Sequence, residues 1–123
     1  MGFRGILHAS FLVADLEVSR TFYEAVLGLE PDPARPNLGF PGLWYTLASG
    51  QQIHLLQLPN PDAGKARPTH GGHDRHVAFG VDDLDELSAR LSGSGITYSL
   101  SHSGRRALFC RDPDGNALEC VES

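Results

Sequence analysis

A stretch of ten residues occurs twice in this chain, and the repeat limits what the chain can fold into. The segment from residue 8 to 17 (HASFLVADLE) matches the segment from 76 to 85 (HVAFGVDDLD) at five of ten positions. Each copy is followed by a helical pattern and then by a glycine, Gly28 in the first half and Gly95 in the second. A tandem duplication explains this agreement better than chance, so we expect two halves of the same local structure.

The ends of the two halves also correspond. Residues 50–54 (GQQIH) resemble residues 115–119 (GNALE): a strand begins after the glycine, and a residue able to bind a metal follows four positions later. His8 lies 46 residues before His54, and His76 lies 43 residues before Glu119. The repeat therefore extends over almost the whole chain.

Each half is predicted to contain a strand, a helix and then further strands. The first strands, at about 6–13 and 76–81, each have a bulky face and a face of mostly smaller residues that includes His8 or His76. Asp15 and Asp83 are the expected N-caps of the two helices. The helices are expected over about Leu16–Leu27 and Leu84–Ser92, and later strands over about 43–48, 52–58, 96–101, 106–111 and 117–121.

This order of elements predicts the α+β class, with two tandem βαβββ modules that form a cupped mixed sheet around a metal site. The whole chain, residues 1–123, is expected to be a single domain. The first module would cover about residues 5–58 and the second about residues 75–122. The stretch 59–74, rich in Pro, Gly and His, would link them.

Composition excludes several classes of protein. The formal charge of −5 argues against a nucleic-acid partner, and no apolar run is long enough to span a membrane. Cys110 and Cys120 make no disulfide framework and are expected to be reduced thiols, which is typical of a cytoplasmic protein.

Four residues at equivalent places in the repeat are candidate metal ligands. His8 and His76 lie on equivalent first strands, and His54 and Glu119 lie on equivalent last strands. If a pseudo-two-fold axis relates the halves, the four positions converge, and three imidazoles with one carboxylate would suit Zn, Ni, Co, Mn or Fe(II). The alternative is that the histidines form structural hydrogen bonds and the glutamate is solvated.

The repeat also carries a resemblance to the vicinal oxygen chelate superfamily, which includes glyoxalase I, extradiol dioxygenases, and fosfomycin and bleomycin resistance proteins. The matching residues are His8, Asp15, Leu16, Phe22, Tyr23, Leu27, Gly28, the run 76–79 (HVAF), Asp83, Leu84 and the run 112–119 (DPDGNALE). The resemblance implies paired modules around a metal, in a protein that is usually a homodimer.

Carried over by position, His8, His76 and Glu119 fall on the usual ligand places of that superfamily. His54 falls where glyoxalase I has a glutamate that serves as a ligand and as a proton-transfer base. The resemblance therefore makes His54 and Glu119 the candidate catalytic residues as well as candidate ligands.

Three functions remain open on this basis. The first is a metal-dependent glyoxalase-like enzyme whose small substrate chelates the metal through vicinal oxygens, with lyase, isomerase or thiol-addition chemistry. The second is an Fe(II) extradiol-type dioxygenase that uses His8, His76 and Glu119. The third is a metal-free binding or resistance protein, in which non-ligand residues would be expected at the four places.

Other residues carry weaker expectations. Arg105 and Arg106 could hold an anionic group, but a solvated turn pair is the expectation. Alternation places Trp44 and Tyr45 on opposite faces of a strand, so one of them should be in the core. His70 and His73 lie in the linker and are expected to be solvated.

Overall fold

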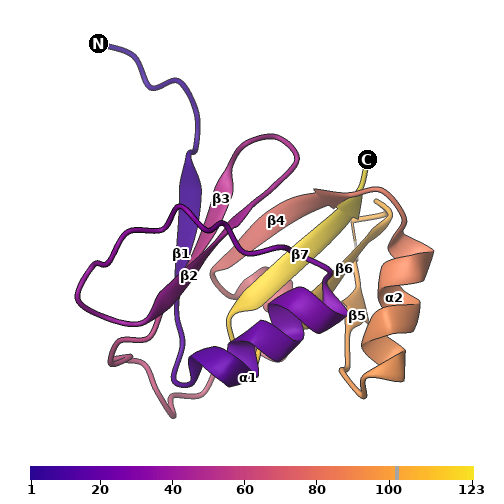
Figure 1. Ribbon diagram of the computed structural model, residues 1–123. Helices are drawn as coiled ribbons and strands as arrows, with labels where there is room; N and C mark the ends of the chain where they lie inside the picture. Colours follow the sequence, from indigo (N-terminus) through magenta and orange to yellow (C-terminus); the bar gives the residue numbers. More distant parts are fainter. Residues whose placement is uncertain (102) are drawn as a thin grey trace. The chain divides into compact units, whose positions relative to one another are not determined.

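The computed structural model describes residues 1–101 and 103–123 (Figure 1). The chain divides into two compact units, Met1–Pro61 and Asp62–Ser123. The residues expected to link the modules are shared between them, since 62–74 belong to the second unit.

The first unit contains a three-stranded sheet. Its elements are β1 (His8–Leu12), α1 (Leu16–Arg20), η1 (Thr21–Val26), β2 (Gly42–Thr46) and β3 (Gln52–Leu56). The strand order is β1-β3-β2, with β1 parallel and β2 antiparallel to β3. The observed strands are shorter than expected, and Leu7, expected on the core face, is 80% exposed because it precedes β1.

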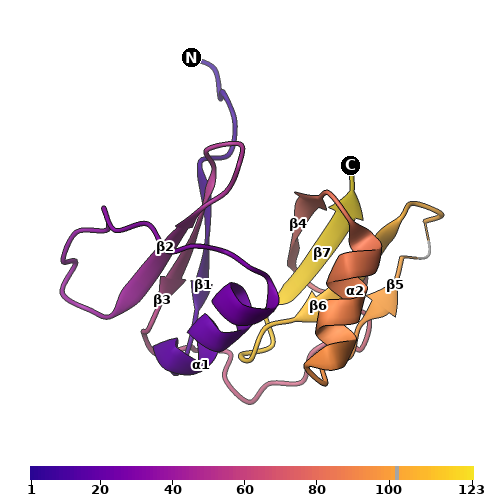
Figure 2. The same ribbon diagram turned by 45° about the vertical axis from the view of Figure 1, so that its right-hand side comes forward.

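The second unit contains a four-stranded sheet. Its elements are η2 (Gly71–His73), β4 (His76–Val81), α2 (Leu84–Gly93), β5 (Ser99–Leu100), β6 (Ala107–Arg111) and β7 (Ala117–Glu122). The strand order is β4-β7-β6-β5, with β4 parallel to β7, and α2 lies along one face (Figure 2). This is a complete βαβββ module, although β5 covers only two residues of the strand expected over 96–101.

Strand register shows that the two units are copies of one arrangement. In the first unit His8 lies opposite Gln52, and His54 lies two residues further along β3. In the second unit His76 lies opposite Ala117, and Glu119 lies two residues further along β7. The α+β class and the pair of related modules are therefore confirmed.

The first module lacks one full strand of the pattern. Where the second unit has β5, the first unit has only an isolated antiparallel bridge between Pro31 and Tyr45. Prolines occupy positions 31, 33 and 36 of this segment, and a proline has no N–H to donate to a sheet. In the first unit, this bridge therefore takes the place of one full strand of the expected βαβββ pattern.

The first helix differs from the continuous helix that was expected over Leu16–Leu27. After Arg20 it becomes the π-helix η1, and the N–H of Leu27 donates to the carbonyl of Phe22, five residues back. Phe22 and Tyr23 are both buried, so the wider turn places adjacent aromatic side chains in the core. Spacing of apolar residues does not distinguish the two kinds of turn. The helical segment ends before Gly28, whose φ of 77° suits glycine.

Aromatic packing forms the core of the first unit. The ring of Tyr23 lies 6.4 Å from that of Phe11 on β1 and 5.9 Å from that of Tyr45 on β2. Tyr45 is fully buried, so it is the core member of the Trp44–Tyr45 pair. The bulky face of β1 therefore packs on the helix, as expected.

Leucines of α2 and the β6–β7 hairpin form the core of the second unit. Leu91 on α2, Leu108 on β6 and Leu118 on β7 are fully buried. The hairpin is closed by the expected turn, in which the N–H of Gly115 donates to the carbonyl of Asp112 at 3.0 Å. Cys110 and Cys120 are both free and buried.

Replacement of Asp83 by alanine should destabilise the protein through α2. The Asp83 carboxylate accepts a hydrogen bond from the N–H of Glu86 at 3.0 Å and caps the helix. Loss of such a cap costs about 0.5–2 kcal/mol of unfolding free energy, which urea denaturation measures. The matched control is Asp82→Ala, which removes a carboxylate beside the cap. An equal loss in both variants would contradict a capping role.

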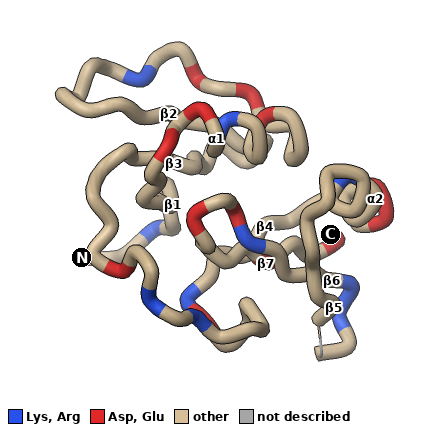
Figure 3. Tube along the Cα trace, turned by 90° about the horizontal axis from the view of Figure 1, so that it is seen from below, with Lys and Arg blue, Asp and Glu red and all other residues tan. Residues whose placement is uncertain are grey.

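Charged residues of both signs occur in both units (Figure 3). Within the part of the chain that the structure describes, no helix is long and apolar enough to cross a membrane.

Candidate functional site

Three stacked rings lie on one face of the first sheet. Because Ser10 and Trp44 both lie opposite His54, the side chains of His8, His54 and Trp44 share a face. The ring centroids of His8 and His54 are 4.0 Å apart, and those of Trp44 and His54 are 4.4 Å apart. The strand register thus brings the first predicted ligand pair together.

His54 is held in this stack by Gln52. The Nε2 atom of His54 lies 2.9 Å from Oε1 of Gln52. An amide oxygen only accepts, so Nε2 donates the proton and Nδ1 keeps a lone pair. Burial lowers the pKa of His54 below 6.5, and the charges of His8 and Arg35 lower it further. His54 is therefore a neutral imidazole near pH 7, the form that binds a metal or accepts a proton.

A titration of His54 should show this directly. We expect the midpoint, followed by the NMR shift of its ring Cε1 proton, to fall below pH 6.5. Because the folded pKa is depressed, protonation favours the unfolded chain, and the His54 contribution to stability declines as pH falls below 6.5. Replacement of His8 by alanine should raise the midpoint only in part, since burial is the larger cause. A midpoint at or above 6.5 in the original protein would contradict the argument.

The second predicted pair meets in the second unit. The Nε2 atom of His76 lies 3.3 Å from Oε1 of Glu119. The other ring nitrogen, Nδ1, lies 2.8 Å from the carbonyl oxygen of Asp74. A carbonyl oxygen only accepts, so Nδ1 donates its proton to Asp74. The Glu119 carboxylate, which Nε2 faces, is also an acceptor.

Glu119 is a buried carboxylate with a second partner. Its side chain is 5% exposed, and Arg105 donates from Nη2 to Oε2 at 2.8 Å. A buried carboxylate needs such pairing, because loss of its hydration is costly. The two arginines are the expected exposed pair in the turn before β6, with side chains 59% and 56% exposed, but both also bind acidic residues. Arg105 binds Glu119, and Arg106 donates to Glu122 and Asp85 because the two arginines sit beside acidic side chains of β7 and α2.

Each unit supplies one pair of the four predicted ligands. Within either unit taken by itself, the described residues bring together no group of three or more His, Cys, Asp or Glu side chains that could hold a metal ion. The donor set of three imidazoles and one carboxylate fits a divalent metal, and the role of these residues as ligands stays a prediction.

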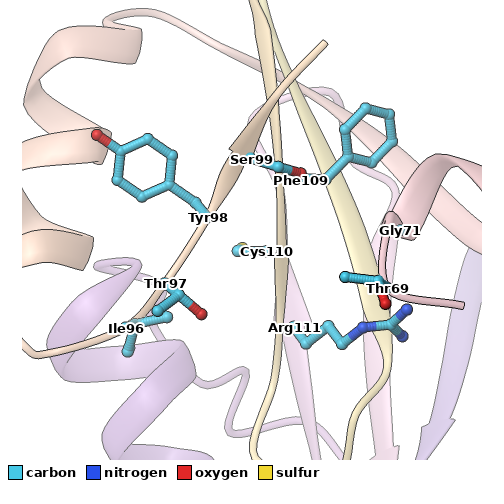
Figure 4. A pocket seen from close by; sticks show the side chains of 9 residues that line it. All are labelled: Thr69, Gly71, Ile96, Thr97, Tyr98, Ser99, Phe109, Cys110 and Arg111. Atoms are coloured by element: carbon cyan, nitrogen blue, oxygen red, sulfur yellow. The ribbon is translucent and has the colours of Figure 1, made fainter. Parts of the chain in front are cut away.

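Phe109 connects the second pair to a pocket. It lies opposite Glu119 in the β6–β7 register, and its ring centroid is 5.5 Å from that of His76. A pocket of about 300 Å³ opens between residues 96–99 and β6, and Phe109 lines it together with Thr69 (Figure 4).

His73 is exposed, as expected for the linker, whereas His70 is half-buried and contacts the rings of Phe109 and His73. The ring of His70 lies 4.8 Å from that of Phe109 and 4.9 Å from that of His73. Their segment folds onto the second sheet, where Gly71 is buried and lies against Phe109.

Sequence reasoning missed the partners that hold three of the four ligand candidates. They are Gln52 for His54, Asp74 for His76 and Arg105 for Glu119. Alternation along β3 places Gln52 on the same face as His54, so this partner could have been found. The other two depend on loop conformation and had no sequence signal.

Paired modules of this kind, each with one ligand-type pair, define a protein of the glyoxalase type. The family model of the Glyoxalase/Bleomycin resistance protein/Dioxygenase superfamily matches residues 5–120. The chain therefore belongs to this superfamily, as the motifs indicated.

Relatives and a solved structure agree with this assignment. The chain is 32% identical to Glyoxylase I 4 of Arabidopsis thaliana, with 91% of this chain and 67% of that protein covered. It is 32% identical to a lactoylglutathione lyase of Haemophilus influenzae, with 96% and 92% covered. A glyoxalase family protein from Bacillus anthracis has a similar crystal structure, with a TM-score of 0.80, 27% identity, and 100% and 98% of the two chains covered.

Proposed function

We propose that this protein is a metal-dependent glyoxalase-like enzyme for a small substrate with two adjacent oxygen atoms. One observation carries the proposal: the repeat places a ligand-type pair at the same register position in each unit. His8 stacks on His54 at 4.0 Å, and His76 faces Glu119 at 3.3 Å. Relatives named glyoxylase I and lactoylglutathione lyase support the reaction class.

His8, His54, His76 and Glu119 would hold the metal. A divalent ion bound there would act as a Lewis acid toward the substrate oxygens. His54 is neutral near pH 7, with Nε2 donating to Gln52, so its Nδ1 can bind the ion or take a proton. His76 presents Nε2 beside Oε1 of Glu119, and Arg105 holds the other oxygen of that carboxylate. Because Arg105 binds Oε2, the other oxygen, Oε1, can bind the metal ion or accept a proton.

Metal analysis with activity assays tests the proposal. Purified protein should contain about one divalent ion per chain, and chelation should abolish formation of lactoylglutathione or addition of glutathione to a test electrophile. Oxygen uptake with catechols, dependent on Fe(II), would favour the dioxygenase instead. Protein that binds no metal under any condition would favour a metal-free binding function and overturn the proposal.

We also propose that two copies of this chain associate into a homodimer. Sedimentation of the purified protein measures this.

A further inference from the structure

Asp74, whose main-chain carbonyl oxygen contacts His76, is itself held by several hydrogen bonds to its side chain. Asp74 accepts hydrogen bonds from Nη2 of Arg67 at 2.8 Å and from Nη1 of Arg111 at 2.8 Å. The main-chain N–H of Arg75 donates to the same carboxylate at 2.9 Å. The Asp74 side chain is 7% exposed. We call Asp74, Arg67 and Arg111 the Asp74 clamp.

The clamp joins three parts of the second unit. Arg111 is the last residue of β6, and it also donates to the carbonyl oxygens of Pro68 and Gly115. Arg67 comes from the segment that leads to β4. Asp74 is therefore anchored through Arg111 to β6 and its turn, and through Arg67 to the segment before β4. Its carbonyl oxygen, which accepts from Nδ1 of His76, can move little.

The geometry points to Asp74 as a positioning residue for His76. Through its main-chain carbonyl the clamp keeps a proton on Nδ1, and it directs Nε2 to Glu119. Outer partners that orient a ligand imidazole in this way raise metal affinity. The effect on metal affinity rests on the proposed function, whereas the choice of tautomer does not.

The alternative is that the clamp only stabilises the loop before β4. Loss of one partner from a buried ion pair destabilises a loop in any protein, whatever lies beside it. The two roles differ in what they predict for the His76 ring. A loop anchor leaves its tautomer unchanged, whereas a positioning residue sets it.

The experiment compares Asp74→Asn with the original protein in two measurements. The ring 15N shifts of His76 report the tautomer in the metal-free protein, and we expect the Nδ1–H form to lose its dominance in the variant. Titration with Zn²⁺ should show binding about 10–100-fold weaker. The matched control is Asp62→Asn, which breaks the exposed ion pair with Arg75 and should change neither measurement.

A second variant guards against loss of folding. Arg67→Gln removes one arm of the clamp and leaves Arg111 in place, so it should shift the tautomer in the same direction by less. An unchanged tautomer in both variants, even with a lowered melting temperature, would overturn the inference. If the original protein does not bind Zn²⁺, the proposed function is undermined, while the 15N shifts still test the role of Asp74.

Discussion

Replacement of His76 by alanine should abolish metal binding, from about one ion per chain to none detectable. Each unit supplies two predicted ligands, so the variant leaves the second unit with Glu119 alone. Arg105 then competes with the ion for that carboxylate, which it already contacts at 2.8 Å. Elemental analysis after dialysis against limited Zn²⁺ measures the stoichiometry, and circular dichroism checks that the variant is folded.

The matched control for this variant is His73→Ala. His73 lies in the same unit and contacts His70, but it is not a predicted ligand. It should retain full metal content. Unchanged stoichiometry in the His76 variant would refute the proposed centre, and an equal loss in both variants would show that the effect comes from the fold.

The largest loss of stability is expected from Leu118→Ala. Leu118 lies on β7 between β4 and β6, where it is fully buried opposite Val77 and Cys110. Removal of its branched end leaves a cavity that central strands cannot collapse to fill, at a cost of about 2–5 kcal/mol. Because the whole protein has only about 5–15 kcal/mol of stability, the variant should unfold at much lower urea concentration.

Leu100→Ala is the control for this prediction. Leu100 lies on the edge strand β5 of the same sheet and is 63% exposed. Its truncation should change the unfolding free energy by about 0.5 kcal/mol or less. A loss in Leu118→Ala no larger than in this control would mean that the face of β7 opposite Glu119 is not the core of the second unit.

The predictions from the repeat were confirmed where they depended on period and spacing. Alternation along β1 and β4 placed His8 and His76 on the less bulky face, and the register agrees with the equivalence of His54 and Glu119. The helix starts were also predicted, since Asp15 and Asp83 accept hydrogen bonds from the first turn of α1 and α2. These are local properties, which neighbouring residues determine.

Errors arose where distant residues decide the local structure. The π-helix η1 places both Phe22 and Tyr23 in the core, and a 3.6-residue pattern does not show this. The single bridge at Pro31 is a different case, because no strand was predicted over these residues and their prolines are a local signal against one. The contact between Arg105 and Glu119 joins residues 14 apart through a loop, so no spacing rule predicts it.

The sequence by itself determined the duplicated α+β architecture, the superfamily and the four residues proposed as ligands. Alternation, capping and repetition are patterns of residues that can be recognised in the sequence alone. Only the tertiary structure decided which loop groups hold two of those residues: the Asp74 carbonyl on His76 and Arg105 on Glu119. The physical reason is that a hydrogen bond depends on where a loop places a donor or acceptor to within a fraction of an ångström. That placement follows from the packing of the whole unit.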